Sequence, residues 1–284
     1  MKIVMLGGTG YLGSKILGRM EKEGYSLLCI TRTPYKYSSR ERVRYCGLQG
    51  LEQEIQGFKP EIFISTVSRY LKEGTTEKDV IEANFEVPAR VLLSCMAVGI
   101  KRVIAVGTSL PESFNIYSFS KKLFAELGKW YADQTQVEFM NIKLEMFYGK
   151  DEPGDRFLSW AVQKMIRNEE IPLTVGTQKR DIIYADDAVD AICSLAGAVM
   201  PERYADIPLG TGEAPTIREV IEYLHRITES RSMLLFGTIP MRANEPDTCA
   251  DKKEMDKWKI TVKYNWKAGM ELFARYIKER QRLC

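Results

Sequence analysis

The stretch "MLGGTGYLG", Met5 to Gly13, places three glycines at equal intervals between an apolar run and an amphipathic segment. The preceding "KIVML" is typical of a buried strand, and the following "YLGSKILGRMEKEG" has the apolar spacing of a helix ending at Gly24. Gly7, Gly10 and Gly13 permit a tight turn and let backbone N–H groups approach a pyrophosphate at the helix N-terminus. We therefore expect a dinucleotide-binding turn, with a ligand-free glycine turn as the alternative.

The rest of the first 150 residues alternates short apolar runs with amphipathic segments. The expected strands are residues 26–32, 61–67, 101–109 and 137–149, and the expected helices are residues 76–99, as one or two helices, and 117–135. Nearly continuous apolar strands that alternate with helices indicate a parallel sheet covered on both faces. The predicted fold class is α/β, a doubly wound parallel sheet of the Rossmann type with a smaller C-terminal substrate-binding lobe.

The pattern changes after Gly149. A helix is expected at 156–170, a strand returning to the sheet and then a helix within 180–199, a helix at 216–227, a strand at 232–237 and a last helix at 267–282. No internal repeat or flexible linker is evident. We therefore predict a dinucleotide-binding domain of residues 1–150, to which 180–207 return, and a substrate-binding lobe of residues 151–179 and 208–284.

Composition argues against several classes of function. A net charge of +3 without a block of Lys and Arg does not indicate a nucleic-acid partner. No stretch approaches the ~20 apolar residues of a membrane helix, and the first residues do not resemble a signal peptide. The six scattered cysteines, without a CxxC pair, suggest reduced thiols in a cytoplasm. The single histidine, His225, argues against a metal site and a Ser-His-Asp relay.

The end of the second expected strand, "CITRTPYKYSSR", bears on the choice of dinucleotide. An NAD site usually offers a carboxylate to the ribose 2′-OH at this place, whereas this chain has Arg32 and no acidic residue before Glu41. A guanidinium suits a 2′-phosphate through bidentate hydrogen bonds. We therefore expect NADP, as NADPH, in preference to NAD; the alternative is a solvated arginine beside NAD.

Within "TSLPESFNIYSFSKK" a tyrosine and a lysine, Tyr117 and Lys121, stand one helical turn apart and can share a face. A nearby ammonium lowers the pKa of a phenol from about 10 toward neutrality. Tyr117 is thus a candidate proton donor to a carbonyl oxygen during hydride delivery, and an acceptor in reverse. Thr108, at the end of the preceding strand, would hydrogen-bond the same oxygen. The alternative is a surface tyrosine and lysine without a role.

Together these motifs resemble the extended short-chain dehydrogenase/reductase superfamily, the NAD-dependent epimerase/dehydratase proteins, in its nucleotide-sugar branch. The similarity covers nearly all 284 residues and includes "GGTGYLG", "IEANFEVPARVLLSCMAVGIKRVI", "KLEMFYG" and "GTQKRDIIYADDAVDAI". It implies cofactor contacts by Gly7, Thr9, Gly10, Tyr11, Leu12, Gly13, Thr31, Arg32, Thr66, Val67, Asn84, Tyr117 and Lys121. It also implies substrate contacts by Thr108, Ser109, Arg180 and Arg242, and the formation of a homodimer in some members.

In that family the segment containing Arg180 and Asp181 lies by the nucleotide diphosphate, and Arg242 corresponds to a second arginine on the same phosphates. Two arginines suit a diphosphate because it offers several bidentate acceptors. Two departures stand out. Thr108 and Tyr117 are closer in sequence than in most extended members, and Met146 replaces the asparagine that usually contacts the nucleotide phosphate.

The segments "GTSLPESFNIYSFSK", "IKLEMFYG" and "RANEPDTCADKKEMDK" are similar to the cytidine-diphosphate paratose/abequose synthase group. The resemblance implies NADPH-dependent reduction of the 4-keto group of a nucleotide-linked dideoxyhexose, in the synthesis of O-antigen sugars of lipopolysaccharide. Residues 64–79 and 151–157 would shape the sugar pocket.

Two other functions remain open at this stage. One is a nucleotide-sugar 4-epimerase or 4,6-dehydratase with resident NAD, although a dehydratase usually has an Asp-Glu pair where Ser109 and Leu110 follow Thr108 here. The other is a regulatory protein that binds NADP and catalyses nothing. Such proteins typically lose the tyrosine or the lysine, and this chain retains both.

Overall fold

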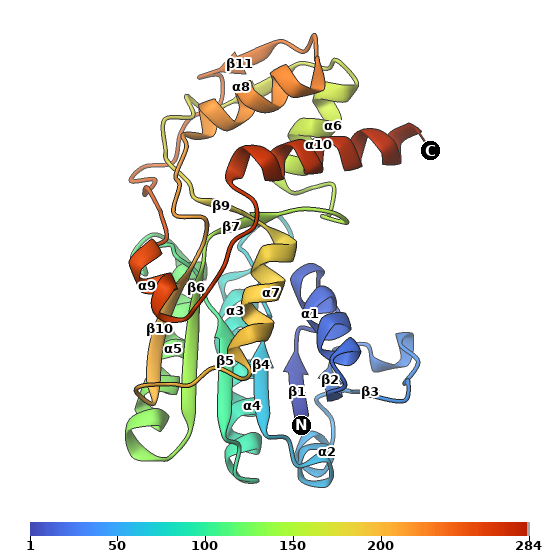
Figure 1. Ribbon diagram of the computed structural model, residues 1–284, viewed down its shortest axis with the longest axis vertical. Helices are drawn as coiled ribbons and strands as arrows, with labels where there is room; N and C mark the ends of the chain where they lie inside the picture. The colour runs from blue at the N-terminus through green and yellow to red at the C-terminus, as the bar shows by residue number, and fades with distance from the viewer. Residues whose placement is uncertain (283–284) are drawn as a thin grey trace. The chain divides into compact units, whose positions relative to one another are not determined.

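The computed structural model describes residues 1–282 and divides into two compact units (Figure 1). The first contains residues 1–144 and 189–207, and the second contains residues 145–188 and the chain from 208 onward. Residues 145–150 and 180–188 therefore group with the second unit, whereas the sequence pattern assigned them to the dinucleotide-binding domain.

A seven-stranded sheet forms the centre of the first unit. Its strands, in spatial order, are β10 (Tyr204–Leu209), β6 (Glu138–Leu144), β5 (Arg102–Val106), β4 (Ile62–Ser65), β1 (Lys2–Leu6), β2 (Ser26–Ile30) and β3 (Val43–Cys46). β1 pairs in parallel with both β2 and β4, and β3, β5 and β6 continue in the same direction. The prediction of an α/β fold with a doubly wound parallel sheet is confirmed. The strand order reverses between β1 and β4, where folds of this type bind their ligands.

The sheet strands bury apolar side chains on both faces, which explains their continuous hydrophobic runs. The helices of this part of the chain are α1 (Tyr11–Lys22), α2 (Leu51–Phe58), α3 (Glu77–Ile81), α4 (Val87–Met96) and α5 (Ile116–Gln134), with a short 3₁₀ turn, η1 (Pro34–Lys36). Between α3 and α4 the backbone widens into a π-helical turn, η2 (Glu82–Glu86). The segment expected to form one or two helices is therefore three consecutive helical pieces.

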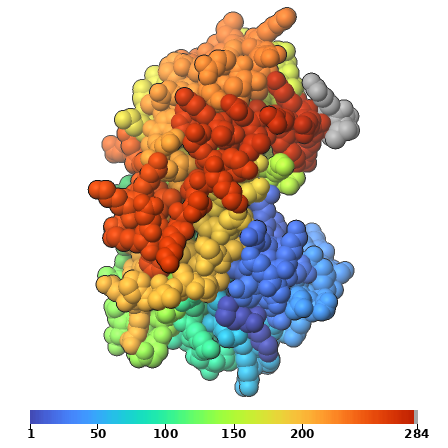
Figure 2. Space-filling view, in the orientation of Figure 1, coloured from blue at the N-terminus to red at the C-terminus, as the bar shows by residue number. Residues whose placement is uncertain are grey.

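The second unit has its own apolar core between helices and two short sheets. Its helices are α6 (Phe157–Ile166), α8 (Ile217–Thr228), α9 (Lys252–Lys257) and α10 (Trp266–Arg282). Strand β8 (Ile171–Leu173) pairs with β11 (Leu234–Phe236), and β7 (Met146–Tyr148) pairs with β9 (Ile182–Tyr184). Helices α8 and α10 contact each other, and both lie on the visible surface in Figure 2. Helix α7 (Ala185–Leu195) spans the division between the units.

Two expectations about strands were wrong. The run 137–149 is not one strand: β6 ends at Leu144, and the next residue, Glu145, buries a carboxylate that accepts a hydrogen bond from the Thr248 hydroxyl (2.7 Å). The strand expected to return to the main sheet, β9, pairs with β7 in a separate sheet, and β10 occupies the sheet edge instead.

Four cysteines, Cys29, Cys46, Cys95 and Cys193, are buried as free thiols, and burial raises the pKa of each of them. Cys284 lies outside the described residues. No helix among residues 1–282 has the length and apolar character needed to cross a membrane.

Two helical glycines give a matched test of how α5 packs on the sheet. A Cβ at Gly128 in α5 would lie 2.2 Å from the Phe139 ring, whereas a Cβ at Gly18 in α1 would meet nothing within 4 Å. Gly128→Ala should therefore lower the free energy of unfolding by about 1–3 kcal/mol through overpacking. Gly18→Ala should raise it by about 1 kcal/mol through helix propensity. Urea unfolding of the two variants checks both signs; equal effects would contradict the tight α5–sheet contact.

Candidate active site at the carboxyl ends of β1, β4 and β5

The glycine turn between β1 and α1 leaves no room for side chains. Gly7 adopts φ +86°, and a Cβ there would lie 2.7 Å from the Val67 backbone nitrogen. A Cβ at Gly13 would lie only 2.0 Å from the Gly7 carbonyl oxygen. Gly10 is the exposed N-cap of α1, donates its N–H to the Gly7 carbonyl (3.0 Å), and provides no side-chain cap. This backbone-lined helix start fits a pyrophosphate, because the first N–H groups of a helix attract anions.

Other residues expected to hold a cofactor surround this turn. Thr66, directly after β4, donates its N–H to the Leu6 carbonyl (2.9 Å). Thr31, directly after β2, is buried and donates its N–H to the Cys46 carbonyl (2.9 Å). Arg32 follows it with an exposed side chain. Thr9 in the glycine turn and Tyr11, the first residue of α1, are half-buried. Leu12 is buried on the inner face of α1.

Tyr117 lies in the first turn of α5, which a capping box between Asn115 and Ser118 fixes in place. Only 6% of Tyr117 is exposed. The Thr108 and Ser68 hydroxyls both hydrogen-bond its phenol. The structure therefore brings Thr108 and Tyr117 together, and it adds Ser68, which the sequence did not single out.

A second tyrosine covers Tyr117. The Tyr70 ring stacks on the Tyr117 ring with centroids 4.2 Å apart and an interplanar angle of 30°. The two hydroxyls hydrogen-bond at 3.4 Å. Tyr70 itself is 51% exposed and lies in the segment after β4, which the sequence marked for the sugar pocket without naming this residue. The sequence signal was one aromatic residue, next to Leu71, in a largely polar loop.

The expected lowering of the Tyr117 pKa by Lys121 was wrong. Burial raises the Tyr117 pKa well above its ordinary value, and the neighbouring Tyr70 adds to the rise, while the Ser68 and Thr108 hydroxyls oppose it. The Lys121 Nζ instead donates to the carbonyls of Val67 (2.6 Å) and Val106 (2.7 Å). Because these carbonyls carry no charge, burial dominates and lowers the Lys121 pKa to about 7. Tyr117 is thus a neutral phenol at neutral pH.

Asn84, which was expected to contact the cofactor, is engaged by hydrogen bonds within the protein. Its side chain is buried in η2 and accepts a hydrogen bond from the Arg69 N–H (2.8 Å). Its amide nitrogen donates to the Arg69 carbonyl (2.9 Å) and the Ser120 hydroxyl (3.0 Å). Ser109, expected to contact substrate, is half-buried, and its N–H donates to the Leu144 carbonyl (3.1 Å).

The two arginines expected to bind phosphate belong to the second unit. Arg180 forms an ion pair with Glu245 and also donates to the Pro246 carbonyl, so its guanidinium is engaged within the protein. The Asp181 carboxylate is fully buried and accepts hydrogen bonds from the backbone N–H groups of Thr211, Gly212 and Ala250, which gives it a structural role. Arg242 is exposed in the loop before Glu245.

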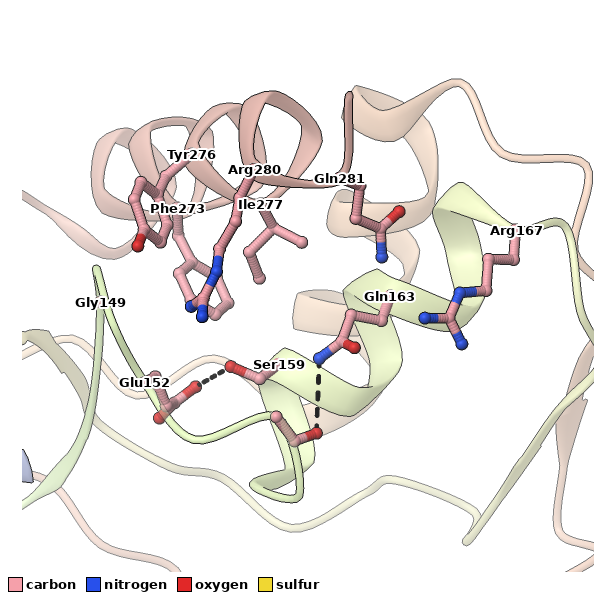
Figure 3. A pocket seen from close by; sticks show the side chains of 11 residues that line it. Gly149, Glu152, Ser159, Gln163, Arg167, Phe273, Tyr276, Ile277, Arg280 and Gln281 are labelled. Atoms are coloured by element: carbon pink, nitrogen blue, oxygen red, sulfur yellow. Dashed lines mark hydrogen bonds between the residues drawn. The ribbon is translucent and has the colours of Figure 1, made fainter. Parts of the chain in front are cut away.

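The second unit contains a cavity of about 410 Å³ between α6 and α10 (Figure 3). Its buried carboxylate, Glu152, accepts a hydrogen bond from Ser159 (2.7 Å) and pairs with Arg156 (3.2 Å). Glu152 and Gly154, which line it, come from the segment 151–157 that was expected to shape the sugar pocket, whereas the individually named catalytic, cofactor and substrate residues do not appear in its lining among residues 1–282. Residues 1–282 also contain no group of three or more His, Cys, Asp or Glu side chains arranged to hold a metal ion.

A glycine turn at the switch point of a parallel sheet, with a buried tyrosine and lysine one helical turn apart beside it, defines a short-chain dehydrogenase/reductase type of site. The chain belongs to the NAD dependent epimerase/dehydratase family, whose model matches residues 3–205.

Relatives with curated descriptions include a CDP-abequose synthase of Salmonella muenchen, 28% identical over 253 residues and 86% of each chain. Another is a CDP-abequose synthase of Salmonella typhimurium, 25% identical over 95% of this chain and 96% of the relative. Among solved structures, the UDP-glucuronic acid 4-epimerase of Bacillus cereus, in complex with UDP-glucuronic acid and NAD, aligns with a TM-score of 0.84. Its 18% identity, over 99% of this chain and all of that one, supports the shared fold.

Lys121→Met should remove a pH dependence of stability. Because the folded-state pKa of Lys121 is about 7 and the unfolded-state value is about 10.4, folding releases a proton between these values. Below the folded-state pKa, the buried ammonium lowers the free energy of unfolding by its full amount. Above that pKa the lysine loses its proton on folding, and this penalty becomes smaller as the pH rises. The free energy of unfolding should therefore rise by about 2 kcal/mol from about pH 6.5 to about pH 8.5 in the cofactor-free protein.

Urea unfolding at both pH values measures this change, and the comparison with Lys121→Met removes the contributions of other groups. Lys122→Met is the matched control, because its neighbouring ammonium pairs with Glu126 (2.7 Å) and has a raised pKa. The same pH slope in wild type and Lys121→Met would show that Lys121 is not the titrating group.

Proposed function

We propose that this protein is an NADPH-dependent reductase of the 4-keto group of a nucleotide-diphosphate-linked deoxyhexose, similar to CDP-abequose and CDP-paratose synthases. The observation that carries the proposal is the buried Tyr117 phenol, hydrogen-bonded to the Thr108 hydroxyl on the same unit as the glycine turn. The matches to CDP-abequose synthases over most of the chain support the choice of substrate class. The product would serve the synthesis of cell-surface polysaccharide.

The glycine turn would hold the cofactor pyrophosphate, because Gly7 and Gly13 leave its surface to backbone atoms. The exposed Arg32, just beyond β2, would bind the 2′-phosphate of NADPH through its guanidinium. Bound NADPH would supply the hydride for the ketone carbon. Lys121 would hold the nicotinamide ribose, in addition to its two backbone carbonyls.

A protonated Tyr117 suits the reduction of a ketone. A ketone oxygen that gains negative charge needs a proton donor, and a phenol with a raised pKa retains its proton at neutral pH. An epimerase must first remove a proton from a sugar hydroxyl, which requires a phenolate. Thr108 would polarise the ketone oxygen while Tyr117 donates its proton to it.

Arg242 would bind the substrate diphosphate, since its side chain is exposed in a loop of the second unit. Arg180 would bind the same diphosphate if a phosphate replaced the Glu245 carboxylate as the anion that pairs with its guanidinium. Ser109 would contact the sugar next to Thr108.

Tyr117→Phe tests the proposed proton donor. Incubation with NADPH and a CDP-linked 4-keto-3,6-dideoxyhexose should consume NADPH in the wild type, as followed by the loss of nicotinamide absorbance. The variant should lose a factor of about 10²–10⁴ in kcat, because general acid catalysis has that magnitude, while its Kd for NADPH stays the same. Tyr131→Phe on the same helix is the control. Conversion of substrate without consumption of NADPH would favour the epimerase instead.

Arg32→Ala tests the choice of cofactor. Loss of a charge-assisted hydrogen bond should raise the KM for NADPH by about 10-fold to 100-fold and leave the KM for NADH unchanged. Arg42→Ala is the control, because its guanidinium is also exposed but donates to the Gly24 carbonyl (3.2 Å). Tighter binding of NAD than of NADP by the wild-type protein would refute the proposed preference for NADPH.

A further inference from the structure

We propose that Asn84 and Tyr70 are positioning residues for the proton donor: Asn84 clamps the segment after β4 so that the Tyr70 ring holds the Tyr117 side chain in place. The inference rests on the proposed function for its catalytic consequence. It gives Asn84 a task different from the cofactor contact that the family resemblance implies.

Asn84 is connected to Tyr117 in two ways, and the first is through the backbone of Arg69 and the ring of Tyr70. Both polar atoms of its side chain bind the Arg69 backbone, through Arg69 N–H to Oδ1 (2.8 Å) and Nδ2 to the Arg69 carbonyl (2.9 Å). This pairing fixes the peptide units on both sides of Arg69 and therefore the direction of the next side chain, Tyr70. Asn84 is 1% exposed, so an uncompensated loss of these bonds would be costly.

The second connection runs from Asn84 through Ser120 to the backbone carbonyl of Tyr117. Asn84 Nδ2 donates to the Ser120 hydroxyl (3.0 Å), and Ser120, fully buried, donates to the Tyr117 carbonyl (2.7 Å). Tyr117 is therefore held at its carbonyl by α5 and at its ring by Tyr70, with Asn84 connected to both. The π-helical turn η2 brings Asn84 inward to this position, and such turns are often found at functional sites.

The stacked Tyr70 ring also excludes water from the phenol. Tyr117 is 6% exposed beside a partner that is itself 51% exposed, so removal of the Tyr70 ring would open Tyr117 to solvent. The groups facing Tyr117 are Ser68 and Tyr70 from the segment after β4 and Thr108 from the end of β5. Lys121, on Tyr117's own helix, directs its ammonium to the Val67 and Val106 carbonyls. Better solvation would return the Tyr117 pKa toward its ordinary value.

A double-mutant cycle of Asn84→Ala and Tyr70→Ala tests the connection. Each single variant should lose about 10-fold to 100-fold in kcat, as expected when a catalytic group is misplaced, with the Kd for NADPH unchanged. The double variant should be no slower than the slower single variant, because both changes release the same ring. On the alkaline side, reduction should decline at a lower pH in all three. Tyr70→Phe should retain most of the activity, since the stacked ring remains.

The control is Tyr37→Ala, because Tyr37 is another half-exposed tyrosine stacked on a second one, Tyr45, with centroids 5.1 Å apart. It should leave kcat and the pH profile unchanged. Three results would overturn the inference: weaker NADPH binding by Asn84→Ala at unchanged kcat, losses that multiply in the double variant, or Tyr70→Phe as slow as Tyr70→Ala.

A measurement without substrate separates this inference from the proposed function. NMR of protein labelled with ¹³C at tyrosine Cζ follows the titration of Tyr117, assigned by its absence in Tyr117→Phe. In Tyr70→Ala, which removes an exposed side chain, the Tyr117 resonance should titrate at lower pH than in the wild type; an unchanged titration would overturn the inference. A wild type that reduces no 4-keto nucleotide sugar would instead refute the proposed function and leave this titration to be judged by itself.

Discussion

The site depends on one buried cation that joins three segments of the first unit. The Lys121 ammonium, carried by α5, donates to the carbonyl of Val67 after β4 and to that of Val106 at the end of β5. These hydrogen bonds set the segment containing Ser68 and Tyr70, the Thr108 hydroxyl and the Tyr117 phenol in one place. Two carbonyls only partly replace the water that such a charge loses, which is why the lysine pKa falls so far.

Because the Lys121 ammonium is bound to backbone carbonyls, it does not lower the pKa of the Tyr117 phenol. A phenol loses its proton easily only where its anion is solvated or paired, and the buried Tyr117 phenol instead faces the neutral hydroxyls of Ser68, Tyr70 and Thr108. The same enclosure that raises the cost of a phenolate keeps the proton on Tyr117, so the side chain is a proton donor and not a proton acceptor at neutral pH. Lys121 acts in this structure by binding the backbone carbonyls of Val67 and Val106.

The sequence predicted the sheet, the glycine turn and the Thr108–Tyr117–Lys121 set because each follows from local periodicity or spacing. It did not predict β3 and α2, whose short segments "VRYC" and "LEQEIQGF" mix polar residues with few apolar ones. The break after Leu144 also escaped it, since a buried Glu145 is stabilised by Thr248, more than a hundred residues away. Tyr70 and the engagement of Arg180 by Glu245 likewise arise from contacts between distant residues, which no local pattern records.

The widened turn η2 has a geometric meaning for the helical segment on either side of it. An α-helix advances about 100° per residue, so one additional residue in a single turn rotates everything beyond it by that angle. Because of this rotation, the buried face of α3, which contains Val80, need not line up with the buried face of α4, which contains Val91. Asn84 points inward between the two helices. Shortening this stretch by a single position would swing one helix face away from the interior, so its length is as constrained as its chemistry.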